Sequence, residues 1–286
     1  MNSLTLSKIE VQRLKEYIES SHLERKPVTN QYEILRAKDR NVNLILYSTG
    51  KLVFNESSKT LDVLNSILER EEGFDHFLGS DETGKGEWYG PLVVVVTALT
   101  PEEIIKLRIL GVKDSKTMKT PKIIETALNI REMGIPYESI VLGPASYNRL
   151  YREFKSEGKS LNDLMAWAHS KIIQKLLGRL EFNQAQVIID KFDQKKTEKR
   201  LGNYDESRVK IIQKTGAETE TPVAAASIIA KSLFEKAVDE LNEKYDLDLK
   251  NSGPEEINPE ILPYVAKAHF KNVKSLLGGR SGLNGK

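Results

Sequence analysis

The chain contains 286 residues, of which 39% are hydrophobic and 29% charged, and its formal net charge is +2. This balance is typical of a soluble globular protein with one large domain, or a large and a small one, and by itself indicates no nucleic-acid partner. The lack of cysteine excludes disulfides and thiolate metal ligands, and no apolar run reaches the roughly 18–20 residues needed to cross a bilayer. The N-terminus lacks the apolar core of a signal peptide, so a cytoplasmic location is expected.

The first 70 residues predict a small α+β unit. The apolar spacing over 7–19 predicts a helix with Ser7 as its N-cap, and its apolar face is expected to contain Ile9, Leu14, Tyr17 and Ile18. Two strand-like runs, 42–47 and 51–54, flank a turn that contains Gly50. Glycine readily adopts the positive φ of such a turn, which predicts a β-hairpin.

A second short helix is expected to begin at Thr60, and the polar segment 70–75 is the expected linker. From residue 76 the pattern alternates between apolar strands and helices, which is typical of an α/β fold. The expected strands are 92–99, 139–142, 186–190 and 208–213, and the expected helices are 101–109, 120–132, 161–179 and 222–245. The last helix starts with Pro222 and several small residues, which permit close packing against a sheet. We therefore predict a mixed sheet within residues 76–286.

Acidic residues stand beside several of these segments. Asp81 and Glu82 precede Gly84, and since adjacent side chains of a strand point to opposite faces, the glycine would be needed to bring both carboxylates to one side. Asp190 ends a predicted strand, where α/β folds commonly carry ligand groups, and Glu218 precedes the small-residue helix. Four carboxylates would suit one or two Mg²⁺ or Mn²⁺ ions. A single acid among 41 is more often a solvated surface charge, and chain order does not show that the four meet.

Several separated motifs carry a family resemblance. They are GSDETGKGEWYGP at 79–91, VKDSK at 112–116, NDLMAWAH at 162–169, VIID at 187–190, AETETPVAAASIIA at 217–230 and YVAKAHF at 264–270. In this order they resemble the type 2 ribonuclease H family, and in particular its ribonuclease HIII members. The segment NLILYSTGKLVF resembles the TBP-like appendage that distinguishes ribonuclease HIII from HII. The resemblance implies a ribonuclease H-like mixed sheet flanked by helices over residues 76–286, and a TBP-like substrate-binding domain over residues 1–70.

The resemblance also assigns site residues. The family's four catalytic, metal-binding acids fall on Asp81, Glu82, Asp190 and Glu218, with Asp193 as a rival to Asp190 and Glu220 as a rival to Glu218. It implies that the backbone of Gly84-Lys85-Gly86 meets the 2′-hydroxyl of the RNA strand, since glycine allows a close approach. Ribonuclease HIII usually has Thr between these glycines and ribonuclease HII has Arg, so Lys85 leaves open which specificity applies.

Other residues near these motifs have less specific roles. Lys113, Ser115 and Lys116 would suit phosphate contacts, although such a run is usually a solvated loop. Core packing is the expected role of Trp88 and Tyr89, and His169 is expected to be a packed or capping residue. His269 has lysines around it and is a candidate to face the substrate.

The resemblance implies an endonuclease that hydrolyses the RNA strand of RNA–DNA hybrids. Two Mg²⁺ or Mn²⁺ ions would take part, and the products would carry 5′-phosphate and 3′-hydroxyl ends. One alternative is HII-like cleavage at single ribonucleotides in duplex DNA. Another is a hybrid-binding protein without turnover, against which the four acids argue, because concentrated negative charge beside phosphates helps a binder only when metals neutralise it. A monomer is expected, and the sequence indicates no protein partner and no membrane association.

Overall fold

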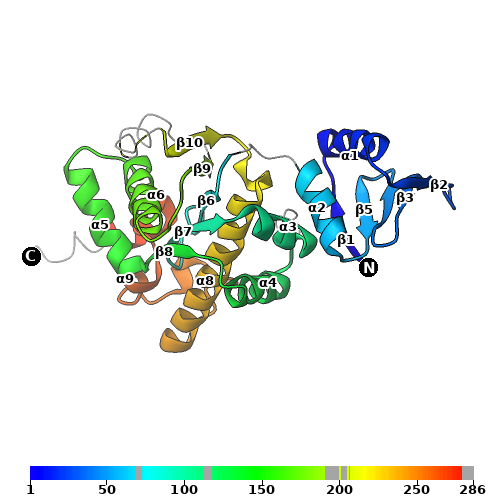
Figure 1. The fold of residues 1–286 in the computed structure, drawn as a ribbon. Helices are drawn as coiled ribbons and strands as arrows, with labels where there is room; N and C mark the ends of the chain where they lie inside the picture. Colours follow the sequence, from blue (N-terminus) through cyan, green and yellow to red (C-terminus); the bar gives the residue numbers. More distant parts are fainter. Residues whose placement is uncertain (69–72, 113–117, 191–199, 201–204, 206, 279–286) are drawn as a thin grey trace, which may run out of the picture.

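The computed structural model describes residues 1–68, 73–112, 118–190, 200, 205 and 207–278. Two five-stranded sheets organise the chain, and each has its own hydrophobic core. Figure 1 shows the N-terminal sheet and its helices, in blue and cyan, beside the larger second unit. None of the described helices combines the length and apolar character required to span a membrane.

The N-terminal sheet is entirely antiparallel, in the order β1-β5-β4-β3-β2. Its strands are β1 (Asn2–Thr5), β2 (Glu24–Lys26), β3 (Glu33–Lys38), β4 (Asn43–Tyr47) and β5 (Lys51–Phe54), and helices α1 (Lys8–Ser20) and α2 (Ser58–Ile67) share one core with it. The predicted hairpin is confirmed, with Gly50 at a φ of +82° in its turn. Helix α2 begins two residues before the predicted Thr60, because the Ser57 hydroxyl accepts the backbone N–H of Thr60 and caps the helix.

Helix α1 carries the predicted N-cap, and all but one of the residues expected on its apolar face pack in the N-terminal core. Ser7 and Glu10 form a capping box, in which each side chain accepts the other residue's backbone N–H. Ile9, expected on the apolar face, is 53% exposed, whereas Glu10 is buried together with Leu14 and Ile18. A buried carboxylate needs a charged or hydrogen-bonding partner. That partner comes from the second unit.

The partner is Arg108, which joins the two units through a buried ion pair. Its Nη1 lies 2.5 Å from Oε1 of Glu10 and its Nη2 lies 3.0 Å from Oε2, while Nη2 also donates to the carbonyl oxygen of Thr5 at 2.8 Å. Ile105, on the same helix as Arg108, is buried in the N-terminal core. The N-terminal unit is therefore held against the second unit by both apolar packing and a bidentate ion pair.

The second sheet is mixed, in the order β10-β9-β6-β7-β8. Its strands are β6 (His76–Thr83), β7 (Leu92–Leu99), β8 (Tyr137–Leu142), β9 (Ala185–Asp190) and β10 (Val209–Lys214). The central strand β6 is parallel to β9 and antiparallel to β7, and β9 is parallel to β10. The helices are α3 (Pro101–Ile109), α4 (Thr120–Glu132), α5 (Pro144–Ser156), α6 (Leu161–Leu177), α8 (Thr221–Tyr245), α9 (Leu262–Val265) and α10 (Lys271–Gly278). The predicted mixed α/β fold is confirmed.

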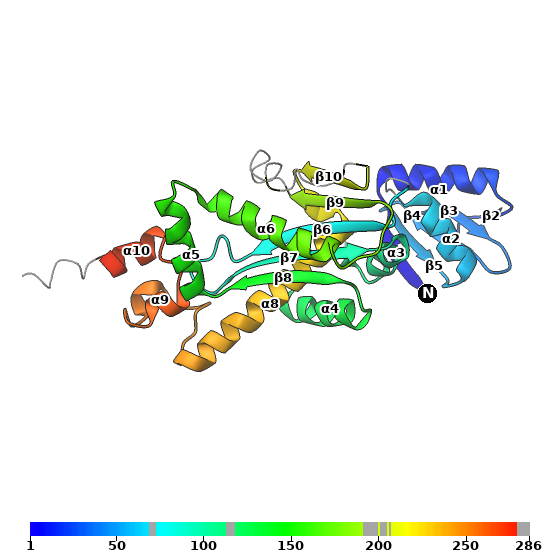
Figure 2. The same ribbon diagram turned by 60° about the vertical axis from the view of Figure 1, so that its left-hand side comes forward.

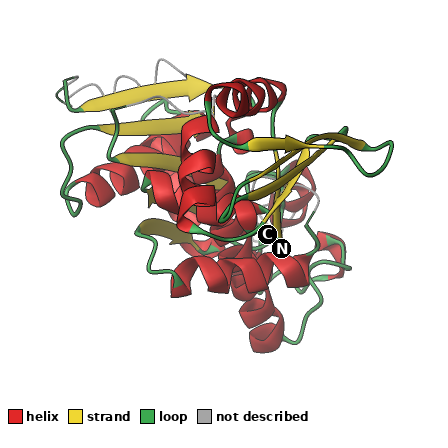
Figure 3. Cartoon of the chain, turned by 45° about the vertical axis from the view of Figure 1, so that its right-hand side comes forward, coloured by secondary structure: helices red, strands yellow, loops and turns green. Residues whose placement is uncertain are grey.

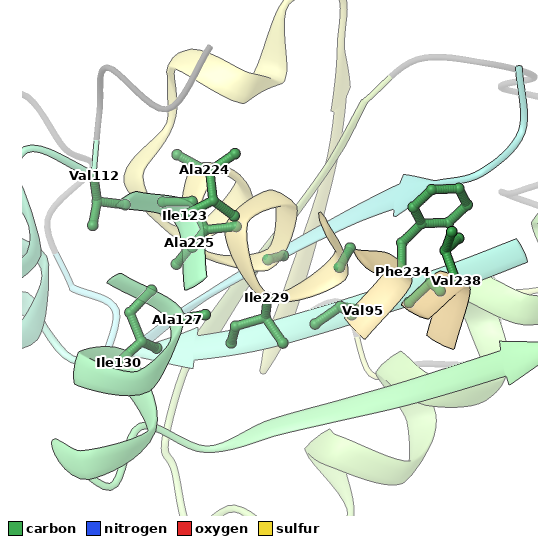
Figure 4. Packing of buried hydrophobic residues seen from close by; sticks show 14 of the residues in the cluster. Val95, Val112, Ile123, Ala127, Ile130, Ala224, Ala225, Ile229, Phe234 and Val238 are labelled. Atoms are coloured by element: carbon green, nitrogen blue, oxygen red, sulfur yellow. The ribbon is translucent and has the colours of Figure 1, made fainter. Parts of the chain in front are cut away.

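Helices cover both faces of this sheet, as Figures 2 and 3 show. Along β7, Val93 and Val95 pack toward α4 and α8, whereas Leu92, Val94 and Val96 pack toward α6. Figure 4 shows Val95 beside Ile229 of α8, with the apolar residues of α4 on the other side of Ile229. A strand buried on both faces is apolar without interruption, which explains the run LVVVV.

Helix α8 approaches β6 very closely at its N-terminal end. A Cβ atom at Gly79 would lie 2.1 Å from the backbone nitrogen of Val223, so only glycine fits there. The residues that follow, Ala224, Ala225 and Ala226, are fully buried. The small-residue start of α8 therefore rests directly on the strand that carries Asp81 and Glu82.

Candidate active site

Two parallel strands place acidic residues at one edge of the second sheet. Ser80 of β6 is the register partner of Ile189 of β9. The next residues along the two strands are Asp81 and Asp190, so both acids stand at the carboxyl end of adjacent parallel strands. This edge is where open α/β sheets carry their ligand groups.

The pleat of β6 sends its two acids to opposite faces. The Asp81 carboxylate accepts a hydrogen bond from the Ser227 side chain of α8. Oε2 of Glu82 instead lies 3.3 Å from Nε2 of His169 on α6. The side-by-side arrangement that Gly84 was expected to permit does not form, because β6 continues to Thr83 before the chain turns.

Asp190 and Glu218 lie on the same face as Asp81. The Ala217 backbone N–H lies 3.4 Å from Oδ1 of Asp190, and Ala217 packs with Ile188 and Val223. Glu218 follows in the short 3₁₀ helix η2 (Ala217–Thr219), which leads into α8. In the described part of the chain, however, no three histidine or acidic side chains are grouped as the ligands of one ion.

The surroundings of Asp81 and Glu82 shift the pKa values of both carboxyls. Burial raises the pKa of Asp81 to about 6, and the nearby Glu82 carboxylate adds to the rise. Burial also opposes ionisation of Glu82, but His169 and Lys85 outweigh it and hold the pKa of Glu82 below its ordinary value. Negative charge thus concentrates at a desolvated edge, where a divalent cation would be stabilised by oxygen ligands. The chemistry of these oxygen donors therefore suits a hard metal ion, although the described side chains are not grouped as the ligands of one ion.

His169 is buried between β6 and α6. Its Nδ1 lies 2.7 Å from Oγ of Ser80, and the Ser80 hydroxyl donates to the carbonyl oxygen of Val95. Nδ1 of His169 is thus within hydrogen-bonding distance of the Ser80 hydroxyl, and Nε2 faces Glu82. The expected packed role is confirmed, and the contact with Glu82 is an addition that sequence reasoning missed. Its position in the NDLMAWAH motif was the available signal.

The two glycines of the Gly84-Lys85-Gly86 segment differ in what the fold demands. Gly84 has a φ of +90°, and a Cβ there would lie 2.0 Å from the carbonyl oxygen of Pro91. Gly86 has no atom within 4 Å of an added Cβ, and its φ lies outside the left-handed region. Folding therefore requires glycine at 84 but not at 86, where only an external group could need the space. Nζ of Lys85 lies 3.4 Å from Oε1 of Glu82.

The remaining predicted residues are distributed as follows. Glu220, the rival to Glu218, forms an ion pair with Lys214 and lines a cavity of 670 Å³ between the two units. His269 packs against Tyr147 and Tyr151, and burial lowers its pKa. The expected core packing of Trp88 and Tyr89 is confirmed. Lys113, Ser115, Lys116 and Asp193 lie outside the described residues.

Comparison with known proteins identifies the family. The family model described as Ribonuclease HII matches residues 78–268. A ribonuclease HIII from Oceanobacillus iheyensis is 30% identical, over 95% of this chain and 96% of that protein. A ribonuclease HIII from Chlamydia felis is 33% identical, over 88% of this chain and 89% of that protein.

A solved structure shares the fold over nearly the whole chain. The crystal structure of Bst-RNase HIII in complex with Mn²⁺ has a TM-score of 0.61 at 24% identity, and the match covers 97% of this chain and 98% of that one. The similarity thus extends through both sheets. From the family match and these relatives, the chain belongs to the type 2 ribonuclease H family, within its ribonuclease HIII branch, and is a ribonuclease H.

Proposed function

We propose that the chain is an endonuclease that hydrolyses the RNA strand of RNA–DNA hybrids with the help of two divalent metal ions. The carrying observation is the register of β6 and β9, which sets Asp81 beside Asp190 on the face where η2 presents Glu218. These three acidic residues stand at the carboxyl ends of two strands and in the turn before α8, and we call this the acidic edge. Glu82 adds a fourth carboxylate from the opposite face.

Asp81, Glu82, Asp190 and Glu218 would hold the ions, which are Mg²⁺ or Mn²⁺ by the hardness of these ligands. When bound, the ions would supply an activated water and charge neutralisation at the departing 3′ oxygen, giving 5′-phosphate and 3′-hydroxyl ends. The chain's own contribution is orientation. Ser227 holds Asp81, the Ala217 backbone N–H holds Asp190, and His169 lies against Glu82. The pKa of Asp81, raised by burial and by Glu82, shows a carboxylate that a cation would stabilise in its charged form.

Recognition of RNA is assigned to the loop after β6. Gly86 provides an open backbone position that the fold does not require to be glycine, which supports close approach of the ribose 2′-hydroxyl. Gly84 shapes the turn that presents it. Lys85 and the VKDSK residues Lys113, Ser115 and Lys116 would add contacts to the substrate backbone.

The N-terminal unit, residues 1–70, is assigned to substrate binding. Its fixed attachment through Arg108 and Glu10 supports this role, because a rigidly held module presents its surface at a set distance from the acidic edge. Deleting residues 1–70 is expected to weaken hybrid binding far more than it slows the cleavage step, although the deletion exposes Ile105 and needs a stability control. Unchanged affinity in a folded deletion variant would contradict the assignment.

The first experiment compares two end-labelled substrates with Mg²⁺ and, separately, with Mn²⁺. One is a continuous RNA–DNA hybrid, and the other is duplex DNA with a single ribonucleotide. Multiple cuts in the hybrid alone are expected. Asp190→Asn should abolish cleavage while hybrid binding is retained, because the variant keeps size and loses only the charge. Tight hybrid binding by the wild-type chain without cleavage under either metal would favour a binding protein instead.

A second candidate, cleavage at single embedded ribonucleotides, is favoured by one observation. Lys85 stands between the two glycines and reaches Glu82, so a cation sits beside both the loop and an acid. Lys85→Thr provides the matched test. If Lys85 determines this activity, the variant loses cleavage of the single-ribonucleotide duplex and retains cleavage of the continuous hybrid.

A further inference from the structure

Lys267 is a fully buried lysine outside the acidic edge. Its exposed fraction is 0%, although lysine is among the residues that are least often buried completely. Its Nζ donates to the carbonyl oxygens of Glu87 and Tyr89, at 2.9 Å and 2.6 Å. Its backbone N–H donates to the carbonyl oxygen of Trp88 at 2.7 Å. One residue therefore binds three consecutive carbonyls of the loop that follows Gly86.

The segment around Lys267 is itself fixed from both sides. The Gly90 N–H donates to the carbonyl of Val265, so the segment and the loop are joined as a short antiparallel bridge. On the other side, Asn148 of α5 accepts from the N–H of Ala268 and donates to the carbonyl of Ala266, both at 2.8 Å. Hydrogen bonds thus connect α5, the segment and the loop in sequence.

A charged group in such a position needs a reason. Burial lowers the pKa of Lys267 to about 7, and Glu87 partly opposes this shift. His269, on the same segment, has its own pKa lowered by burial and by the charge of Lys267. Burying an ammonium group is costly unless its hydrogen bonds are made, and a buried apolar side chain of similar length would avoid this cost. What the ammonium group adds is a specific backbone geometry at residues 87–89.

We propose that Lys267 is a positioning residue for residues 84–90, which we call the substrate loop. By binding three consecutive carbonyls of this loop, it fixes the loop's backbone before the substrate arrives. The proposal rests on the proposed role of Gly84-Lys85-Gly86 in reading the ribose. A loop held in advance gives up less conformational freedom on binding, and a displacement of about 1 Å at a reacting centre can cost about 100-fold in rate. Lys267 acts through the loop and does not touch the reacting atoms.

The test uses Lys267→Met, which keeps the aliphatic stem and removes the ammonium group. Lys236→Met is the matched control, since Lys236 is an exposed lysine on α8. The Met variant is expected to show amide hydrogen exchange at least about tenfold faster over residues 84–90 and a kcat on the hybrid at least about tenfold lower. Binding of Mn²⁺ alone should stay unchanged, because the four acids are untouched, and the change in KM should be smaller than the change in kcat.

Several results would overturn the proposal. Unchanged exchange over residues 84–90 would do so, as would a loss of activity that merely follows the folded fraction. If the Met variant is unfolded by circular dichroism, Lys267→Gln, which keeps an N–H donor, is measured in the same way. Failure of both variants to fold would assign Lys267 to the core alone. The exchange measurement needs no substrate, so it tests Lys267 even if the wild-type chain does not cleave the hybrid and the proposed function fails.

Discussion

His169 of α6 and Glu82 of β6 meet between the helix and the sheet, with Nε2 of the imidazole 3.3 Å from Oε2 of the carboxylate. The histidine is almost completely buried, and its other ring nitrogen is held by Ser80. Glu82 therefore has a fixed neighbour on the face opposite Asp81. The orientation of this acid depends on a residue 87 positions away in the chain (169 − 82).

Removing this neighbour should affect activity through Glu82. His169→Ala is expected to raise the pKa of Glu82, because His169 is the main group that lowers it, and to reduce cleavage or metal affinity about 10- to 100-fold. The measurement is the rate of hybrid cleavage against metal concentration. His22→Ala is the control, since that histidine is exposed in the N-terminal unit. A rate equal to that of the control at every metal concentration would rule out this role for His169.

The raised pKa of Asp81 predicts a stability that depends on pH. The folded protein holds a proton on Asp81 up to about pH 6, whereas the unfolded chain releases it near 3.8, so the contribution of Asp81 to the free energy of unfolding falls as pH rises between these values. The contribution is of order 3 kcal/mol. Without metal, Asp81→Asn should therefore be more stable than the wild type at pH 8, and this advantage should shrink toward pH 4.

Thermal unfolding of both proteins at the two pH values, with and without Mn²⁺, checks this prediction. The metal should stabilise the wild type at pH 8 more than Asp81→Asn, because a charged ligand is missing in the variant. An Asn variant that is less stable than the wild type at pH 8 without metal would show that Asp81 is not a source of strain.

The Glu10–Arg108 pair predicts that substitutions of its two residues change the free energy of unfolding in a strongly non-additive way. Arg108→Met alone should lower the free energy of unfolding by about 3–5 kcal/mol, because it leaves the Glu10 carboxylate buried without its partner. The double variant Glu10→Leu, Arg108→Met should recover much of that loss. Denaturant unfolding of the two single variants, the double variant and the wild type measures the coupling. Additive single losses would mean that apolar packing alone joins the units.

The two glycines of the substrate loop predict opposite outcomes for the same substitution. Gly84→Ala should destabilise the fold, because the φ of +90° disfavours a side chain and the added Cβ would meet the Pro91 carbonyl. Gly86→Ala should leave stability within about 0.5 kcal/mol of the wild type, because nothing surrounds its Cβ. It should nonetheless slow hybrid cleavage by obstructing the approach of the ribose. Full activity in Gly86→Ala would remove residue 86 from substrate recognition.

Where the local sequence decides the structure, sequence reasoning identified elements to the residue. The strand 92–99 and the helices 101–109 and 120–132 are confirmed with their predicted bounds. Thr100 and Pro101 explain one of these successes, because a capping box and a proline in the first turn fix where a helix begins. Strand β7 was recognisable because burial on both faces leaves it uninterrupted by polar residues.

Other elements were hidden because tertiary contacts override local preference. Strand β6 was missing from the strands that the apolar pattern predicted, because it contains Gly79, Ser80 and Asp81, which are poor strand formers, and its pairing with β7 and β9 stabilises it. Helix α5 was not predicted, although Pro144 begins it, because polar residues dominate most of its length. Its buried Asn148 has a role only when the segment near residue 267 is present.

The candidate site divides in the same way. The four acids could be proposed from their motifs, but the faces of Asp81 and Glu82 depend on where β6 ends. Because the strand continues to Thr83, both acids lie within it and point to opposite faces. The buried charges of Glu10 and Lys267 were not foreseeable from spacing. Their partners lie 98 and about 180 positions away, and only the folded chain brings them together.

The close contact of Gly79 with the start of α8 determines the distance between the second sheet and this helix. A single added carbon atom would push the start of α8 away from β6 and would carry Ser227 and the turn with Glu218 along with it. The strand-borne and helix-borne acids therefore cannot drift apart independently, since one backbone contact determines how far the layers stand from each other. The spacing of the acidic residues at this edge is thus determined by Gly79, a residue that has no side chain and takes no part in the chemistry.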